Sequence, residues 1–139
     1  MARHEVAVTD RGSFFPMRHY PLTILWFIFI FIVCLMPVPE TPLSHVVNID
    51  KFVHLGLWLV ASLIIWFEYF RAPERWQPRR PLWLTLVLPV LASGSIELLQ
   101  AYATTCRSGD WLDFLFNAAG VILAALIVHI CKRKVKNEK

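Results

Sequence analysis

Four long apolar runs take up most of the chain and leave room for little besides membrane-spanning helices. They cover residues 22–36, 52–69, 82–100 and 111–130. Each run approaches the ~20 residues that a helix needs to cross a hydrocarbon core about 30 Å thick. Only 17% of the residues are charged, whereas a soluble domain carries roughly 25%. The sequence therefore predicts an all-α integral membrane protein, a four-helix bundle with no separate soluble domain.

Basic residues alternate between the segments that connect these runs. Every Lys and Arg except Lys51 and Arg107 lies before the first run, between the second and third runs, or after the fourth. Short segments rich in Lys and Arg stay on the cytoplasmic side of a membrane. We therefore expect both termini to be cytoplasmic, with a polar arm at residues 1–19, the four-helix domain at 20–131 and a basic tail at 132–139.

Polar residues inside the apolar runs are expected to gather toward the outer side of the membrane. In the third run, Pro89, Ser93, Glu97 and Gln100 follow one another at spacings of four, four and three, which puts them on one helix face. Pro89 is expected to kink this helix because it lacks an amide hydrogen. Burying a charge such as that of Glu97 in hydrocarbon costs at least ~2.5–3.5 kcal/mol. A shared location for such groups therefore points to function.

A second polar stripe opens the fourth run. Asp113, Asn117, Gly120 and Ala124 are spaced by four, three and four, so one helix face changes from polar residues to small ones. Asp110, just before this run, is expected to cap the helix. Gly120 and Ala124 form a small surface that lets another helix approach closely. The sequence leaves open whether that helix belongs to the same chain or to a second copy in a homo-oligomer.

The second run contributes Asp50 and His54, which lie four residues apart and share a face. Together with the stripes of the third and fourth runs, they predict a polar pocket on the outer side of the membrane. Arg107 is expected to join this pocket because its planar fork matches a phosphate or a carboxylate. The candidate catalytic residues are His54, Glu97 and Asp113. The candidate ligand-binding residues are Asp50, Gln100, Arg107 and Asn117.

The order and spacing of these polar residues resemble one protein family. The motifs are Asp50-Lys51-x-x-His54, Glu97-x-x-Gln100 and Arg107-x-x-Asp110-x-x-Asp113-x-x-x-Asn117-x-x-Gly120. Over residues 20–130 the chain resembles the VanZ-like family of small multi-pass membrane proteins, named for a member linked to glycopeptide (teicoplanin) resistance in bacteria. The resemblance implies a place in the bacterial cytoplasmic membrane and a role at the cell envelope. It assigns neither an activity nor antibiotic resistance to this chain.

Three functions fit these residues. The first is binding of an anionic, lipid-linked envelope molecule, with Arg107 on its phosphate. The second is an enzyme that acts on a lipid phosphate or an envelope precursor, with His54 and Glu97 as the acid–base pair. The third is a structural or partner-binding subunit, in which the polar cluster fixes the helix register.

Expected partners are membrane lipids and a lipid-linked envelope precursor. The net charge of +4 follows from the cytoplasmic basic segments and gives no reason to expect nucleic acid. No cofactor is expected. A metal ion would need oxygen and nitrogen ligands such as Asp50, His54, Glu97 and Asp113, but their spacing is not diagnostic of a metal site, so none is predicted.

Overall fold

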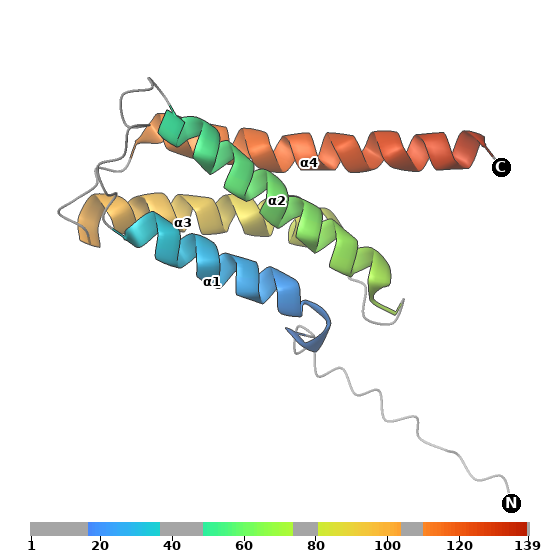
Figure 1. The fold of residues 1–139 in the computed structure, drawn as a ribbon, viewed down its shortest axis with the longest axis horizontal. Helices are drawn as coiled ribbons and strands as arrows, with labels where there is room; N and C mark the ends of the chain where they lie inside the picture. Colours follow the sequence, from blue (N-terminus) through green and yellow to red (C-terminus); the bar gives the residue numbers. More distant parts are fainter. Residues whose placement is uncertain (1–16, 37–48, 74–80, 104–109, 139) are drawn as a thin grey trace, which may run out of the picture.

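The computed structural model describes residues 17–36, 49–73, 81–103 and 110–138. Within these ranges the chain is helical and contains no strand, which confirms the all-α fold class. A short 3-10 helix, η1 (Met17–His19), precedes α1 (Pro21–Leu35). Helix α2 (Ile49–Arg71) follows, and then the π-helix η4 (Trp83–Val87) leads directly into α3 (Leu88–Ala103). The last element is α4 (Trp111–Asn137), and Figure 1 shows the four long helices side by side.

Three helical segments are long and apolar enough to cross a membrane. They are Ile49–Arg71, Trp83–Tyr102 and Trp111–Asn137. Helix α1 has 15 residues, or about 22 Å at ~1.5 Å per residue, and so is shorter than the ~30 Å hydrocarbon core. All four helices expose large apolar side chains, as lipid-facing surfaces do. The cytoplasmic location of the two termini remains a prediction.

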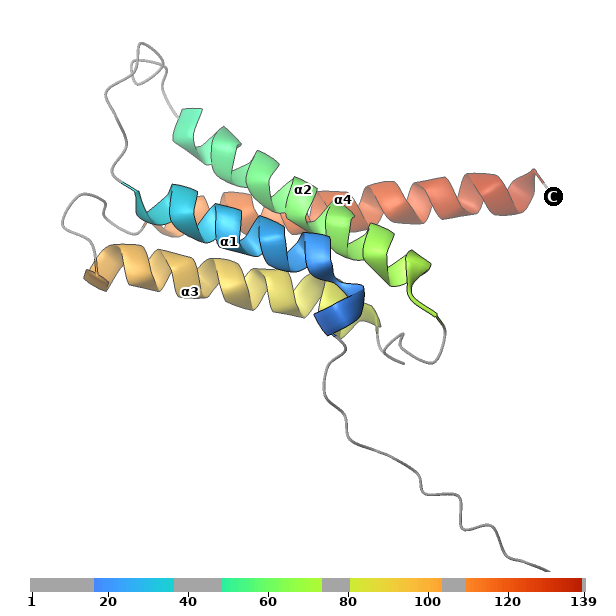
Figure 2. The same ribbon diagram turned by 60° about the horizontal axis from the view of Figure 1, so that its bottom comes forward.

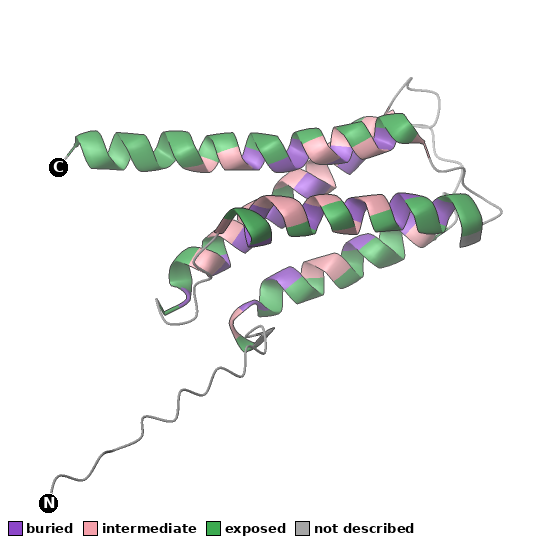
Figure 3. Cartoon of the chain, turned by 180° about the vertical axis from the view of Figure 1, so that it is seen from behind, coloured by how far each residue is buried: buried purple, intermediate pink, exposed green. Residues whose placement is uncertain are grey.

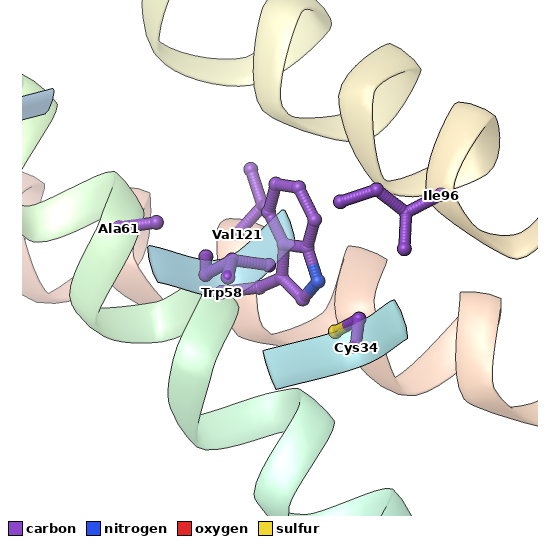
Figure 4. Packing of buried hydrophobic residues seen from close by; sticks show 6 residues of the cluster. Cys34, Trp58, Ala61, Ile96 and Val121 are labelled. Atoms are coloured by element: carbon purple, nitrogen blue, oxygen red, sulfur yellow. The ribbon is translucent and has the colours of Figure 1, made fainter. Parts of the chain in front are cut away.

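The core lies where all four helices meet. Trp58 of α2 is completely buried and packs in one cluster with Cys34 of α1, Ile96 of α3 and Val121 of α4. Figure 4 shows the Trp58 indole among these side chains. A single large ring from α2 therefore fills the space that the other three helices leave between them.

Helices α2 and α4 approach most closely at Gly120. A Cβ atom at this position would overlap the main-chain oxygen of Leu55 and stand 3.0 Å from the main-chain nitrogen of Leu59. Gly120 is buried, and Ala124, one turn further on, is completely buried. The small surface of these two residues is thus packed within the chain, against α2 at Gly120.

The end of α4 extends beyond the bundle. Figures 1 and 3 show it reaching past the other helices, and its last turns are coloured as exposed in Figure 3. Residues 129–138 are all exposed. Because α4 continues to Asn137, the basic tail expected from residue 132 begins as the last turns of this helix.

The irregularity expected at Pro89 lies in the turn before it. The amide of Leu88 donates to the carbonyl of Trp83, five residues earlier, as in a π-helix. The hydroxyl of Thr85 donates to the carbonyl of Pro81 at 2.8 Å. The wider turn and the hydroxyl bond accommodate a proline that has no amide hydrogen of its own.

Candidate functional site

Three buried polar side chains from three helices meet at one end of the bundle. His54 comes from the first turns of α2, Asn117 from α4, and Glu97 from the second half of α3, and they are exposed by 2%, 0% and 8%. Asn117 Nδ2 donates to Glu97 Oε1 at 3.1 Å. Asn117 Oδ1 lies 3.1 Å from His54 Nδ1. Asn117 is therefore the link between the acid and the imidazole.

The contact with the Asn117 amide assigns a hydrogen to one nitrogen of the histidine ring. An amide oxygen only accepts, so His54 Nδ1 carries the hydrogen of the 3.1 Å contact. The same Nδ1 lies 3.6 Å from Glu97 Oε1. His54 Nε2 then faces Asp50, whose Oδ1 is 4.0 Å away. The two ring nitrogens thus point at groups of the protein itself.

Glu97 is satisfied at one oxygen only. Its Oε1 accepts from Asn117, whereas its Oε2 is buried and has no hydrogen-bond partner among the described residues. The main-chain amide of Asp110 acts on this carboxylate electrostatically but does not reach the geometry of a hydrogen bond. A buried oxygen without a donor costs free energy, so Oε2 is the atom of this site that most needs an outside partner.

An ion cluster covers the end of the polar site. Lys51 Nζ lies 3.1 Å from Asp110 Oδ2 and 3.3 Å from Asp113 Oδ1. Asp110 also accepts from the amide of Leu112 at 2.9 Å, which confirms its role as the N-cap of α4. That amide, and then the Lys51 ammonium, hold the pKa of Asp110 below its ordinary value.

Lys51 was missing from the residues expected at this site. One sequence feature could have identified Lys51: it lies at the start of an apolar run, where an ammonium needs an acidic partner or contact with lipid headgroups. Because α4 starts at the same end of the bundle as α2 (Figure 1), the two aspartates that open α4 come within its reach. Sequence spacing within α2 gave no indication of partners 59 and 62 residues away.

The other expected ligand-binding residues lie in different surroundings. Gln100 is buried and donates through Nε2 to the main-chain oxygen of Cys34 at 2.7 Å. It therefore ties α3 to the end of α1 and stands outside the Glu97–Asn117–His54 chain. Asp50 is half exposed, at 50% of its side chain. Arg107 lies outside the described residues.

Among the described residues, one group of side chains at this end could act as ligands of a metal ion. Asp50, His54 and Asp113 each offer one such atom, and these atoms lie within 4.8 Å of one another. The Lys51 ammonium, 3.3 Å from Asp113, already supplies a positive charge there. Glu97 is not a member of this group, so the set differs from the four ligands considered from the sequence.

A cavity of about 430 Å³ opens between α3 and α4 beside Glu97. Its walls are mostly apolar, with Leu91 and Leu98 from α3 and Trp111 and Phe114 from α4. Glu97 and Asp110 are its charged lining residues, and His54 is not part of its wall. The cavity thus presents an apolar surface and a carboxylate to anything that enters between the two helices.

Sequence reasoning also missed a second buried carboxylate, at the opposite end. Glu68 lies within the apolar run 52–69 but near the end opposite Glu97, so the expectation that such groups all gather on one side of the membrane is wrong for this residue. It is 5% exposed. It accepts from the amides of Leu22 and Thr23 at 2.7 and 2.9 Å and from the Thr23 hydroxyl at 2.6 Å. Glu68 therefore caps the start of α1 from another helix.

The comparison with known proteins agrees with this arrangement of helices and polar residues. The model of the VanZ/LLP1 family matches residues 8–132. No curated protein and no solved structure matches the chain. Because the family match covers both the membrane helices and the polar site, the chain belongs to the VanZ/LLP1 family.

Proposed function

We propose that the protein binds a lipid-linked molecule of the cell envelope in the cavity between α3 and α4. The apolar chain of such a ligand would lie against Leu91, Leu98 and Phe114, and its polar headgroup would reach Glu97. The observation that carries this proposal is the buried Oε2 of Glu97, which has no hydrogen-bond partner among the described residues and belongs to a residue of the cavity wall. A membrane location in bacteria, in the cytoplasmic membrane, is part of the same proposal.

The charges of the cavity specify what the headgroup must offer. Glu97 and Asp110 line the wall, so the part of the ligand next to them has to donate hydrogen bonds, as sugar hydroxyls do. A phosphate on the same ligand needs a positive charge beside these carboxylates. Arg107, three residues before Asp110 in the sequence, is the residue we propose for that phosphate.

Binding explains the geometry better than catalysis does. An acid–base pair must reach the same substrate, but only Glu97 lines the cavity, and His54 is turned toward Asn117 and Asp50. A purely structural role explains Gln100 and Asn117, which tie helices together. It does not explain why Glu97 keeps an unsatisfied oxygen next to a cavity.

Native mass spectrometry of the protein, purified gently from its own membrane, tests the proposal. The wild type should carry a lipid-linked species that Glu97→Gln loses. The substitution suits the test because a glutamine can still accept from Asn117 at the position of Oε1, while its amide nitrogen takes the place of Oε2. The bundle should therefore fold with its cavity intact, but a hydrogen-bond donor replaces the acceptor at the position of Oε2.

A matched pair of alanine variants separates the cavity from the rest of the surface. Ala101 and Ala119 are both exposed, but only Ala101 lines the cavity. Ala101→Phe should displace the ligand, and Ala119→Phe should leave it bound. A wild-type protein that is empty, with Glu97→Gln merely less stable, would favour the structural role. Release of a modified lipid by the wild type alone would favour the enzyme.

A further inference from the structure

A second cavity lies at the other end of the bundle, where α1 begins and α2 ends. It has a volume of about 310 Å³ and lies between the η1–α1 junction and the last turns of α2. Figures 1 and 2 show these two segments close together, and hydrogen bonds from α1 to Glu68 join them. Two guanidinium groups line the cavity, one from Arg18 of η1 and one from Arg71 at the end of α2.

Both arginines lack an acidic partner in the described part of the chain. Glu68 lines the same cavity, but the start of α1 occupies its two oxygens with three donors. Neither Arg18 nor Arg71 forms an ion pair within the described ranges, and the Arg71 guanidinium instead lies over the ring of Phe67, 5.3 Å from its centre. The cavity is therefore lined by two arginines and by one carboxylate whose oxygens are already bonded to α1.

This surplus of positive charge fits a phosphate group. A guanidinium presents a planar fork of donors that matches phosphate oxygens, and two forks on one cavity allow two such contacts. Apolar surface adjoins them, since Leu22 and Phe67 line the cavity and are 48% and 50% exposed. A charged headgroup with an acyl chain beside it matches both kinds of surface at once.

We propose that the cavity formed by Arg18, Leu22, Phe67 and Arg71 is a binding site for the phosphate of an anionic phospholipid. The two guanidinium groups hold the phosphate, and the acyl chains follow the exposed faces of Leu22 and Phe67 along α1 and α2. Bound lipid bridges η1 and α2, and so adds to the hydrogen bonds by which Glu68 of α2 holds the start of α1. This site is separate from the cavity beside Glu97.

Thermal unfolding of the full chain in detergent, with phosphatidylglycerol or phosphatidylcholine added, tests the site. Phosphatidylglycerol should raise the unfolding temperature of the wild type, and phosphatidylcholine should raise it less. In the double variant Arg18→Gln with Arg71→Gln, the apparent affinity for phosphatidylglycerol should fall at least about tenfold, because both charge-assisted contacts to the phosphate are lost.

Three controls make the result decisive. Arg133→Gln with Lys136→Gln removes the same charge from the exposed end of α4 and should keep the lipid effect; an equal loss in both double variants would overturn the site. If the first double variant does not fold, Arg18→Lys with Arg71→Lys is the substitute, because it keeps the charge but loses the planar guanidinium. This variant should bind phosphatidylglycerol more weakly than the wild type does. Unchanged binding would count against the proposal. If glycerol 3-phosphate raises the unfolding temperature as much as phosphatidylglycerol does, the proposal that the ligand is a lipid is wrong.

Discussion

Glu68 and Glu97 are two buried carboxylates in the same small bundle, and their surroundings differ in a way that decides what each one does. They are exposed by 5% and 8% and lie near opposite ends of the bundle. Glu68 accepts three hydrogen bonds shared between its two oxygens. Within the described part of the chain, Glu97 accepts one, from Asn117, and its second oxygen has no donor; the residue lines an apolar cavity.

The comparison shows that burial alone is a weak guide to function in membrane helices. An ionisable group in a membrane span suggests a functional site by default, and both residues meet that description. Glu68 instead caps α1: it accepts hydrogen bonds from the first amides of that helix, which lack partners within the helix itself. Glu97 differs from Glu68 because its Oε2 has no hydrogen-bond donor among the described residues. The predictions below test that distinction.

The largest effect is expected for Glu68→Gln. Both oxygens of Glu68 accept, so whichever way the new amide turns, its nitrogen faces a donor of α1. The free energy of unfolding should fall by about 3 kcal/mol, as expected for the loss of hydrogen bonds to a buried charge. Chemical unfolding in detergent measures it. A loss no greater than that of Glu97→Gln would remove the contrast between the two residues.

Gly120→Ala tests the contact that brings α4 and its Asn117 against α2. The new methyl group would overlap the main-chain oxygen of Leu55, which cannot move without its helix, so stability should drop by about 1–3 kcal/mol. Gly56→Ala is the control, because no atom lies within 4 Å of a Cβ there. That variant should be neutral or more stable by up to ~1 kcal/mol. Equal effects at both glycines would show that α2 and α4 are not in close contact.

Glu97→Gln should cost less than about 1 kcal/mol of stability, because the hydrogen bond from Asn117 is kept and no donor is turned against another. Its effect should appear in ligand retention instead. Unfolding and native mass spectrometry on the same preparation compare the two quantities. A large loss of stability with ligand still bound would place Glu97 beside Glu68 as a structural residue.

The smallest effect is a pH dependence at the end where Glu97 lies. The pKa of Asp110 is held below its ordinary value by the Leu112 amide and then by Lys51. A carboxyl whose folded pKa is depressed stabilises the fold above its ordinary pKa, about 3.9, and this contribution is lost as the pH falls through the depressed value. Asp110→Asn should therefore reduce the acid sensitivity of the unfolding temperature below about pH 4. If the unfolding temperature of Asp110→Asn falls in acid as much as that of the wild type, the cap and the Lys51 contact do not form in solution.

Much of the fold was predictable because it depends on local properties of the chain. Each of the four apolar runs corresponds to one helical segment, although α2 and α4 extend beyond their runs, and Asp110 caps α4 as its residue type and position indicated. The polar stripe of α3 was also predictable from its spacing, and Ser93, Glu97 and Gln100 are indeed all buried. Neither the helix boundaries nor these faces required knowledge of any distant contact.

The partners of the polar groups were not predictable in the same way. Gln100 was grouped with Glu97 because they share a face, yet it bonds to the end of α1. Lys51 was not among the expected site residues, yet it joins the two aspartates that open α4. In each case the partner lies on another helix, and spacing along one helix carries no information about it.

The sequence by itself determined that this chain is a helical membrane protein of one family, since hydrocarbon admits long apolar segments only as helices that satisfy their own backbone. It also indicated several of the polar residues that are buried, Glu97 and Asn117 among them, but not Glu68. The tertiary structure alone decided their roles. Glu68 is a cap because the start of α1, 45 residues away, supplies its donors. Glu97 is a candidate binding residue because packing brings Asn117 to one of its oxygens, while the other has no donor among the described residues.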